Sequence, residues 1–203
     1  MKKIIVLLAF FVVSSSTIAQ IKIRPGVKLG LNNSRLQGLD NAESITGING
    51  GLFVNFDFTR FYELQIETGY SQQGATVNRT LSINLNDPFF TNNRIEEDID
   101  LQYLSLGIAN KFFVMAKDHG FHFIVGPSID IIVNDTNFNS TPIDLSFFGG
   151  IGYEFPFGLA IEARYKQGVI DVEDTYDSST YNDVDYYYTN SVFQIGAAYK
   201  FDF

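Results

Sequence analysis

The fold is decided by the C-terminal stretch, which reads Val192-Phe193-Gln194-Ile195-Gly196-Ala197-Ala198-Tyr199-Lys200-Phe201-Asp202-Phe203. From Phe193 onward every second residue is apolar, and the residues between are small, polar or charged. A period of two predicts a β-strand with one apolar and one polar face. A terminal aromatic strand left as a free edge would promote aggregation. We therefore expect this strand to close a barrel, with its aromatic end at a membrane interface.

Residues 1–19 have the organisation of a secretory signal peptide. A short basic start, Met1-Lys2-Lys3, precedes an uninterrupted apolar run over residues 4–13 and then a mostly small-residue segment ending at Ala19. This order predicts cleavage near Ala19, which leaves residues 20–203 as one domain. The apolar run is too short for a spanning helix, which needs about 20 residues.

The composition narrows the class of protein further. The net charge is −9, and removal of the leader with its two lysines makes the mature chain more acidic. An acidic chain without a basic patch argues against nucleic acid as a partner. The chain contains 0 cysteines, so it forms neither disulfides nor thiolate metal sites. Because no second long apolar run follows, a mature chain that spans a membrane must do so as a closed β-barrel.

Alternating segments recur along the whole mature chain. We predict eight strands, over residues 25–33, 47–57, 62–71, 99–114, 121–133, 143–155, 159–169 and 192–203. The long connections are expected at residues 34–46, 72–98, 134–142 and 171–188, with short turns between them. Long loops at one end and short turns at the other are typical of outer-membrane barrels. The sequence thus predicts an all-β fold, an eight-stranded antiparallel up-and-down transmembrane barrel whose last strand pairs with the first.

Several details test this interpretation. Ile99, Leu101 and Tyr103 share one parity and the apolar residues from Leu104 onward the other, which predicts a bulge near Tyr103. Pro127 lies inside a strand and predicts a second bulge. Aromatic residues beside the short turns, Phe113 among them, are expected in an interfacial girdle. The alternative is a secreted soluble sandwich or lipocalin-like barrel, which would use the same strands with the apolar face turned inward.

The polar strand faces carry charges of both signs, which we expect to point into the lumen. The principal members of this predicted cluster are Lys28, Glu63, Glu67, Glu162, Arg164, Lys166 and Lys200. Lys111, Asp130, Asp144 and Glu154 extend it. An eight-stranded barrel is just wide enough to be filled by side chains. The favoured interpretation is therefore structural, an ion-paired closure of the pore, and a proton or ion path with a gate is the functional alternative.

The sequence contains no recognisable motif for a catalytic residue, a cofactor site or a metal centre, so we expect none of these. The two histidines, His119 and His122, lie at a short-turn end and have no serine or acid tied to them by spacing. We therefore expect no enzyme activity.

The acidic stretch after residue 170 offers a weak Ca²⁺ loop. Its oxygen ligands would come from Asp171, Glu173, Asp174 and Asp177. The spacing differs from that of an EF-hand, so a solvated surface loop is the preferred interpretation.

Residues 162–171 read EARYKQGVID. The order Arg164-Tyr165, two residues, Gly168-Val169 resembles the penultimate strand of the PorT-like outer-membrane β-barrel family of Bacteroidetes, whose members often have Leu in place of this Val. The segments 26–32 and 192–203 are similar to the first and last strands of that family. The resemblance implies an eight-stranded outer-membrane barrel and, as in some members, a connection with a system that secretes proteins across the outer membrane.

We therefore expect a non-enzymatic integral protein of the Gram-negative outer membrane with a structural or interaction role, in protein secretion or surface binding. Its expected partners are outer-membrane lipid, the barrel-assembly machinery during insertion, and a secretion-machinery or extracellular protein. The first alternative is a narrow channel or transporter. The second is a lipid-modifying barrel enzyme, which would depend on His122.

Overall fold

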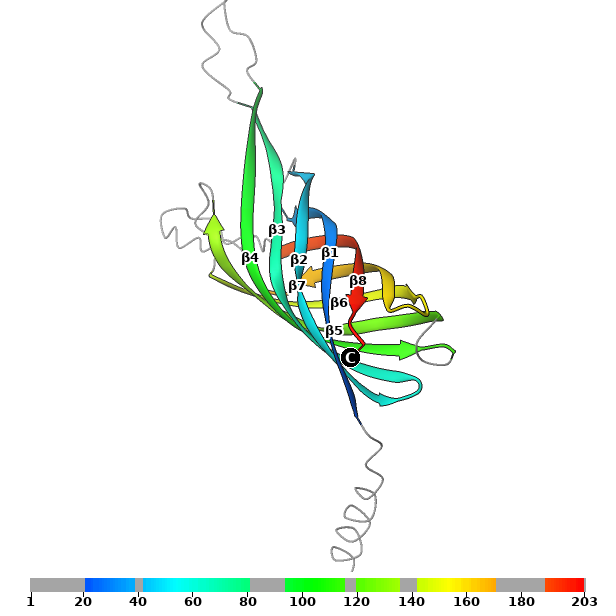
Figure 1. Cartoon of the computed structure of the whole chain (residues 1–203). Coiled ribbons are helices and arrows are strands. Elements are labelled where there is room, and N and C mark those ends of the chain that lie inside the picture. The colour runs from blue at the N-terminus through cyan, green and yellow to red at the C-terminus, as the bar shows by residue number, and fades with distance from the viewer. Residues whose placement is uncertain are drawn as a thin grey trace, which may run out of the picture.

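The computed structural model describes residues 21–38, 42–80, 94–115, 120–135, 142–170 and 189–202. Its strands are β1 (Lys22–Gln37), β2 (Ala42–Thr59), β3 (Tyr62–Thr80), β4 (Arg94–Phe113), β5 (Gly120–Asp135), β6 (Ile143–Glu154), β7 (Leu159–Gly168) and β8 (Thr189–Lys200). They pair in chain order and close into one antiparallel barrel (Figure 1). The predicted fold class is confirmed.

The barrel closes between β8 and β1, as the C-terminal stretch predicts. Their pairing runs without a register shift from Gly26 opposite Lys200 to Gln37 opposite Thr189. The Phe201 amide continues it by donating to the Pro25 carbonyl over 2.8 Å. The strand itself ends at Lys200, earlier than predicted, and residue 203 lies outside the described residues.

Alternation along the strands separates an apolar outer surface from a polar interior. Leu29 and Leu52 point outward and are 72% and 61% exposed, whereas the Glu63 and Asp130 side chains inside are 0% exposed. A soluble barrel would show the opposite arrangement, so that alternative is wrong. An apolar outer band around a polar interior is the arrangement that suits lipid outside the barrel.

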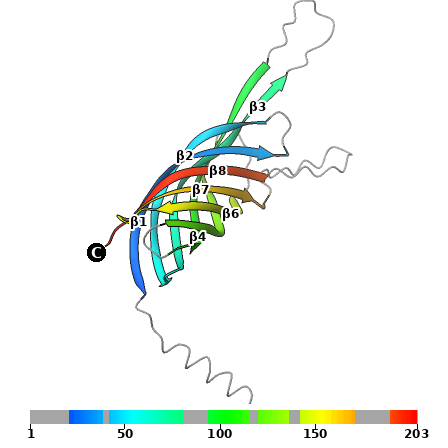
Figure 2. The ribbon, with the colours of Figure 1, turned by 90° about the vertical axis from the view of Figure 1, so that its right-hand side faces the viewer.

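The two ends of the barrel differ in shape. The terminal end holds the start of β1 and the end of β8, together with the tight β2–β3 and β6–β7 turns. At the opposite end, here called the hairpin end, β3 and β4 rise beyond the other strands (Figures 1 and 2). Within the described residues no helix has the length and apolarity needed to cross a membrane.

Two hairpins at the hairpin end are longer than predicted. The expected loop 34–46 is mostly strand, because β1 runs to Gln37 and β2 begins at Ala42. Parts of the expected loop 72–98 are strand as well, because β3 runs to Thr80 and β4 begins at Arg94. Beyond the bilayer the outer face of a strand meets water. Polar residues can therefore occupy that face while the strands remain paired, and they do not indicate a loop. The prediction of a long first connection is therefore wrong, because only residues 38–41 separate β1 from β2.

The structure has an irregularity at the first predicted bulge, near Tyr103, but it does not have the predicted effect on β4. The β3–β4 register is continuous, and Ile99, Leu101 and Tyr103 all point inward while Leu104 points outward. A register shift does occur at Gln102/Tyr103, but only against β5, and it does not change the parity of β4. The apolar residues of β4 therefore pass from the inner to the outer face along an unbroken strand.

The second predicted bulge, at Pro127, is absent from the pairing of β5 with β4 and β6. Pro127 pairs in register with Phe147 of β6. On its other side, the β4–β5 pairs stop at Gly107 opposite Ser128 and resume at Asn110 opposite Val125. A proline has no N–H to donate, which accounts for an interrupted ladder without an extra residue.

Aromatic rings gather on the outer surface at the terminal end. Tyr62 lies against Phe112 with ring centroids 5.3 Å apart, and Tyr199 against Phe201 at the same distance. Such a girdle is expected where a barrel crosses a membrane interface. Phe113 was predicted in this girdle, and this is wrong, because its buried ring faces the lumen.

Candidate functional site: the ion-paired lumen

The lumen is filled with charged side chains contributed by all eight strands. They are Arg24, Lys28, Asp57, Glu63, Glu67, Lys111, Asp130, Asp144, Glu154, Glu162, Arg164, Lys166 and Lys200. Every charged residue of the predicted cluster lies here. Sequence reasoning omitted Arg24, which lies one residue before the expected start of the first strand but has the inward parity. It also omitted Asp57, which ends the polar face of the second strand.

The layer nearest the terminal end is centred on Glu63. Its carboxylate accepts hydrogen bonds from Arg24 over 3.0 Å and from Lys200 over 3.1 Å. Arg24 also lies 3.0 Å from Asp57, and Lys200 lies 2.5 Å from Glu154. These five side chains come from β1, β2, β3, β6 and β8, so the layer joins distant parts of the wall.

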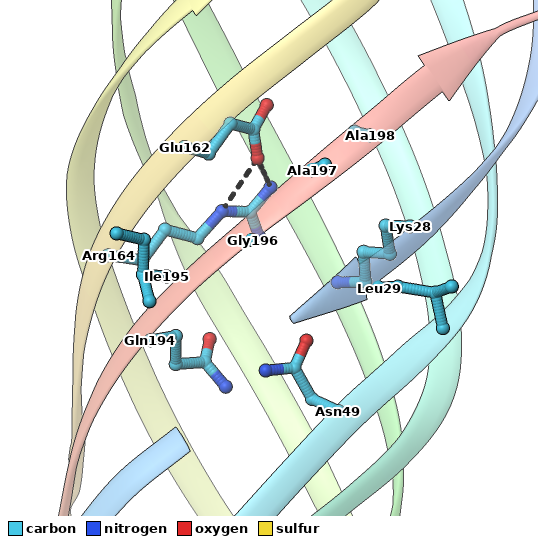
Figure 3. A pocket seen from close by; sticks show the side chains of 10 residues that line it. All are labelled: Lys28, Leu29, Asn49, Glu162, Arg164, Gln194, Ile195, Gly196, Ala197 and Ala198. Atoms are coloured by element: carbon cyan, nitrogen blue, oxygen red, sulfur yellow. Dashed lines mark hydrogen bonds and ion pairs between the residues drawn. The ribbon is translucent and has the colours of Figure 1, made fainter. Parts of the chain in front are cut away.

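The central layer is a chain of alternating charges. Lys28 lies 2.9 Å from Glu67, which accepts a hydrogen bond from Arg164 over 2.8 Å. Arg164 also donates to Glu162 over 2.7 Å, and Lys111 donates to Glu162 over 2.6 Å. Figure 3 shows Arg164 beside Glu162 on β7, with Lys28 facing them from β1. Charges arranged in this way compensate one another in a region that water barely reaches.

The next layer toward the hairpin end has a neutral network on one wall and an ion pair on the other. Asn32 donates to Ser71 over 3.0 Å, while its own side-chain oxygen accepts from Asn49 and Gln194 over 2.6 and 3.0 Å. On the opposite wall Lys166 forms an ion pair with Asp130. Because these contacts connect β1, β2, β3 and β8 on one side and β5 and β7 on the other, they also hold the strand register.

The lumen ends in an apolar cap at the hairpin end. We use this name for the buried cluster of Leu36, Ala42, Ala75, Ile99, Leu101 and Tyr103. Leu101 and Tyr103 are 0% exposed. The cap lies on β1–β4, and buried polar side chains, Ser34, Gln73 and Asn190, lie at the same level, so the charged interior gives way there to a mixture of apolar and neutral polar groups.

The cavities left between these side chains are small. Two cavities adjoin Lys28, and each has a volume of about 30 Å³. Figure 3 shows one of them, bordered by Asn49, Gln194 and Arg164. A volume of this size holds a water molecule or two. A larger cavity of about 320 Å³ opens at the terminal end between Lys22, Lys200 and Phe157.

Glycine makes room for the wider side chains. A Cβ atom at Gly152 would lie 2.4 Å from Nε2 of His122. His122 is 1% exposed, its ring lies 4.9 Å from that of Phe113, and Nε2 is 3.5 Å from Glu162. This histidine is thus part of the lumen packing and is shielded from lipid. His119 lies outside the described residues.

The described residues contain no group of three or more histidine, aspartate and glutamate side chains arranged to hold a metal ion. The weak Ca²⁺ loop, Asp171, Glu173, Asp174 and Asp177, lies outside the described residues.

An eight-stranded barrel with an apolar outer band, an aromatic girdle and a charged interior has the architecture of a small outer-membrane protein. Comparison of the chain with protein families agrees with this class. Residues 5–201 match the family described as outer membrane protein beta-barrel domain, and the chain belongs to this family.

Three of the solved structures to which the chain is similar are bacterial proteins. Ail, the attachment invasion locus protein of Yersinia pestis, solved with the heparin analogue sucrose octasulfate, is 13% identical, with 89% of this chain and 99% of that chain covered and a TM-score of 0.46. Neisserial surface protein A is 11% identical, and the match covers 87% of this chain and 97% of that protein with a TM-score of 0.47. OprG from Pseudomonas aeruginosa is 12% identical, and the match covers 89% of this chain and 95% of OprG with a TM-score of 0.41. No curated protein matched the chain.

Proposed function

We propose that this protein is a closed, non-enzymatic barrel of the outer membrane, which holds its projecting strands at the cell surface for a structural or interaction role. The observation that carries the proposal is the filled lumen. The ion pairs of Glu63, Glu67 and Glu162 cross the interior from several strands, and the apolar cap narrows the hairpin end on β1–β4.

The network opposes ion flow for energetic reasons. A permeating ion would have to separate Arg164 from Glu67 and Glu162, and leaving buried charges without partners costs about 3–5 kcal/mol. It would then have to pass the buried side chain of Leu101 in the apolar cap, which offers it no polar ligand. A narrow channel is therefore the less favoured function.

Conductance across planar lipid bilayers tests this proposal. We expect no ion steps from the purified protein, with a large porin as the positive control. The double variant Lys28→Ala, Arg164→Ala joins and enlarges the two cavities and shows whether the assay detects a widened lumen. Heat-modifiability on gels verifies that both proteins are folded. Stable ion steps from the unchanged protein would overturn the closed barrel and support the channel.

The finer assignments are proposals as well. We place the protein in the PorT-like group of Bacteroidetes on the residues 162–171, with cleavage near Ala19 and with a component of a secretion system or an extracellular protein as its partner. Support comes from the family match and from the leader pattern of residues 1–19. The mass of the protein extracted from outer membranes tests the cleavage site, since retention of residues 1–19 would contradict it.

A further inference from the structure

The cavity of about 320 Å³ at the terminal end is large enough to hold more than water. Ligand pockets in proteins have volumes of about 300–1,000 Å³. The walls of this one come from the start of β1, the β6–β7 turn and the end of β8, with Arg24, Glu154 and Lys200 on its inner side. Because the short turns of an outer-membrane barrel face the periplasm, a ligand would enter from there.

The β6–β7 turn forms a fixed wall of the cavity. The Phe155 amide donates to the Leu159 carbonyl over 2.7 Å, and the Gly158 amide donates to the Phe155 carbonyl over 3.1 Å. The Gly158 carbonyl accepts from the Lys200 amide over 2.9 Å, which ties the turn to β8. Gly158 has a φ of 87°, a conformation that glycine adopts readily. The wall is therefore formed before a ligand arrives, which lowers the ordering cost of binding.

Glu154 supplies a buried carboxylate to this cavity. It is 1% exposed, and its Oε1 lies 2.5 Å from Nζ of Lys200. Its Oε2 has no hydrogen-bond partner among the described residues. The same Lys200 ammonium also donates to both carboxylate oxygens of Glu63, over 3.1 and 3.2 Å. One cation is thus shared by two carboxylates, although a buried charged oxygen needs donors of its own.

The layer around Glu63 contains more buried carboxylates than cations. Among the described residues, Asp57, Glu63 and Glu154 face only Arg24 and Lys200 within this layer. The layer therefore has room for one more positive charge at its open side.

The neighbouring cations do not fill that place. The central layer has one cation in excess, but Lys111 donates to Glu162 over 2.6 Å and Lys28 lies 2.9 Å from Glu67, so neither ammonium is bonded to Glu154.

An anion would find no unpaired cation in the cavity. Arg24 and Lys200 both contact Glu63, and Lys22 at the outer rim forms an ion pair with Asp202. A cation, in contrast, would meet a carboxylate oxygen without a donor. The charges of the cavity therefore favour a positively charged ligand.

We propose that this cavity binds an organic cation, a primary ammonium or guanidinium group that donates to Oε2 of Glu154. The ring of Phe157, which lines the cavity and is 63% exposed, offers a cation–π contact at the entrance. The group would belong to a small amine of the periplasm or to a lysine or arginine side chain of a periplasmic protein. This site goes beyond the structural role proposed above, since it lies at the end of the barrel opposite the projecting strands.

Binding of butylammonium to the mature protein in nanodiscs tests the site, with NMR of the glutamate carboxyl groups as the readout. We expect a saturable shift of the Glu154 resonance at neutral pH. Butanol and butyrate keep the alkyl chain but carry a neutral or a negative head group, and they should bind at least about tenfold more weakly. A short capped peptide with a single lysine distinguishes the two sources. Tighter binding of this peptide than of butylammonium supports a protein side chain, and weaker binding supports a small amine.

Glu154→Gln is the matched variant, because it keeps the shape of the side chain and removes its charge. We expect it to bind butylammonium at least about tenfold more weakly while keeping its heat-modifiability. Glu43→Gln makes the same change of charge at an exposed position of the hairpin end and should bind as the parent protein does.

The shift of the Glu154 resonance in the parent protein keeps the test valid if the variant does not fold. Equal binding of butyrate or butanol, an unchanged Glu154 resonance, or a Glu154 carboxyl that is already protonated at neutral pH would overturn the proposal. None of these results bears on conductance, so the closed barrel and this site fail separately.

Discussion

Between the terminal end and Leu104 the strands turn charged side chains inward and apolar ones outward, whereas around the apolar cap this arrangement is reversed. On β4 the two patterns meet within a few residues, since Leu101 is 0% exposed and Leu104 is 48% exposed. On β1 the same change separates outward Leu31, 53% exposed, from inward Leu36, 1% exposed. The outer positions beside the cap, Arg35 and Glu43, are exposed and charged.

The difference follows from the solvent outside the wall. A strand surrounded by lipid needs an apolar outer face, and its inner face can then be polar if the polar groups are satisfied. A strand surrounded by water gains stability by turning its apolar side chains inward. The level of Leu104 on β4 and Leu31 on β1 therefore marks the hairpin-side boundary of the bilayer. Beyond that level the barrel is built like a soluble β-protein.

The largest effect is expected from breaking the charged region at its centre. Arg164→Met removes the cation shared by Glu67 and Glu162 and leaves an excess of buried negative charge. We expect the free energy of unfolding to fall by about 3–5 kcal/mol, measured by urea unfolding in lipid vesicles with circular dichroism. The matched control is Ile161→Met on the same strand, which faces outward. An equal loss in both variants would contradict the role of the network.

The lipid boundary is tested on the outer face of β4. Ile108 is 44% exposed and lies in the middle of the outward apolar run, whereas Gln102 lies on the outer face beyond the boundary. We expect Ile108→Arg to cost about 2–4 kcal/mol of folding free energy in a bilayer. Gln102→Arg should change it by no more than about 0.5 kcal/mol. A comparable cost at both positions, measured by the same unfolding assay, would move the boundary above Gln102.

A smaller effect is expected at the junction between the two regions. Gly74 has a φ of 147°, and a Cβ atom there would lie 1.9 Å from the Ile99 carbonyl oxygen. Gly74→Ala should therefore strain the hairpin and cost about 1–3 kcal/mol. Gly149→Ala is the control, because the nearest atom to its added Cβ is 4.0 Å away. Faster amide exchange in residues 75–80 and 94–100 of the Gly74 variant would localise the strain, and exchange unchanged from the parent protein would contradict it.

The sequence predicts the membrane-facing region better than the cap. Period-two alternation identifies all eight strands and the inward charges other than Arg24 and Asp57, because lipid imposes apolar residues at every second position. The change of parity between Tyr103 and Leu104 was interpreted as a bulge, since alternation alone does not say which solvent lies outside. The same ambiguity made the polar ends of β1 and β3 resemble loops. Partner choice within the lumen, such as Glu67 with Arg164, depends on register across strands that are distant in the chain, and a single sequence does not give it.

The smallest effect is expected at an ion pair outside both regions, between Lys22 and Asp202 at the terminal end. The hydrogen bond from Lys22 holds the pKa of the Asp202 carboxyl below its usual value. The contribution of such a carboxylate is present at neutral pH and is lost on acidification from its unfolded-state pKa of about 3.9 down through the lower folded value. Both side chains are largely exposed, so water screens the pair and Lys22→Gln should leave the free energy of unfolding unchanged.

Carboxyl NMR titration should nevertheless show the pKa of Asp202 returning toward its ordinary value. A stability loss as large as that of Arg164→Met would show that the charges at the rim are as poorly solvated as those in the lumen, and the contrast between the two environments would then fail.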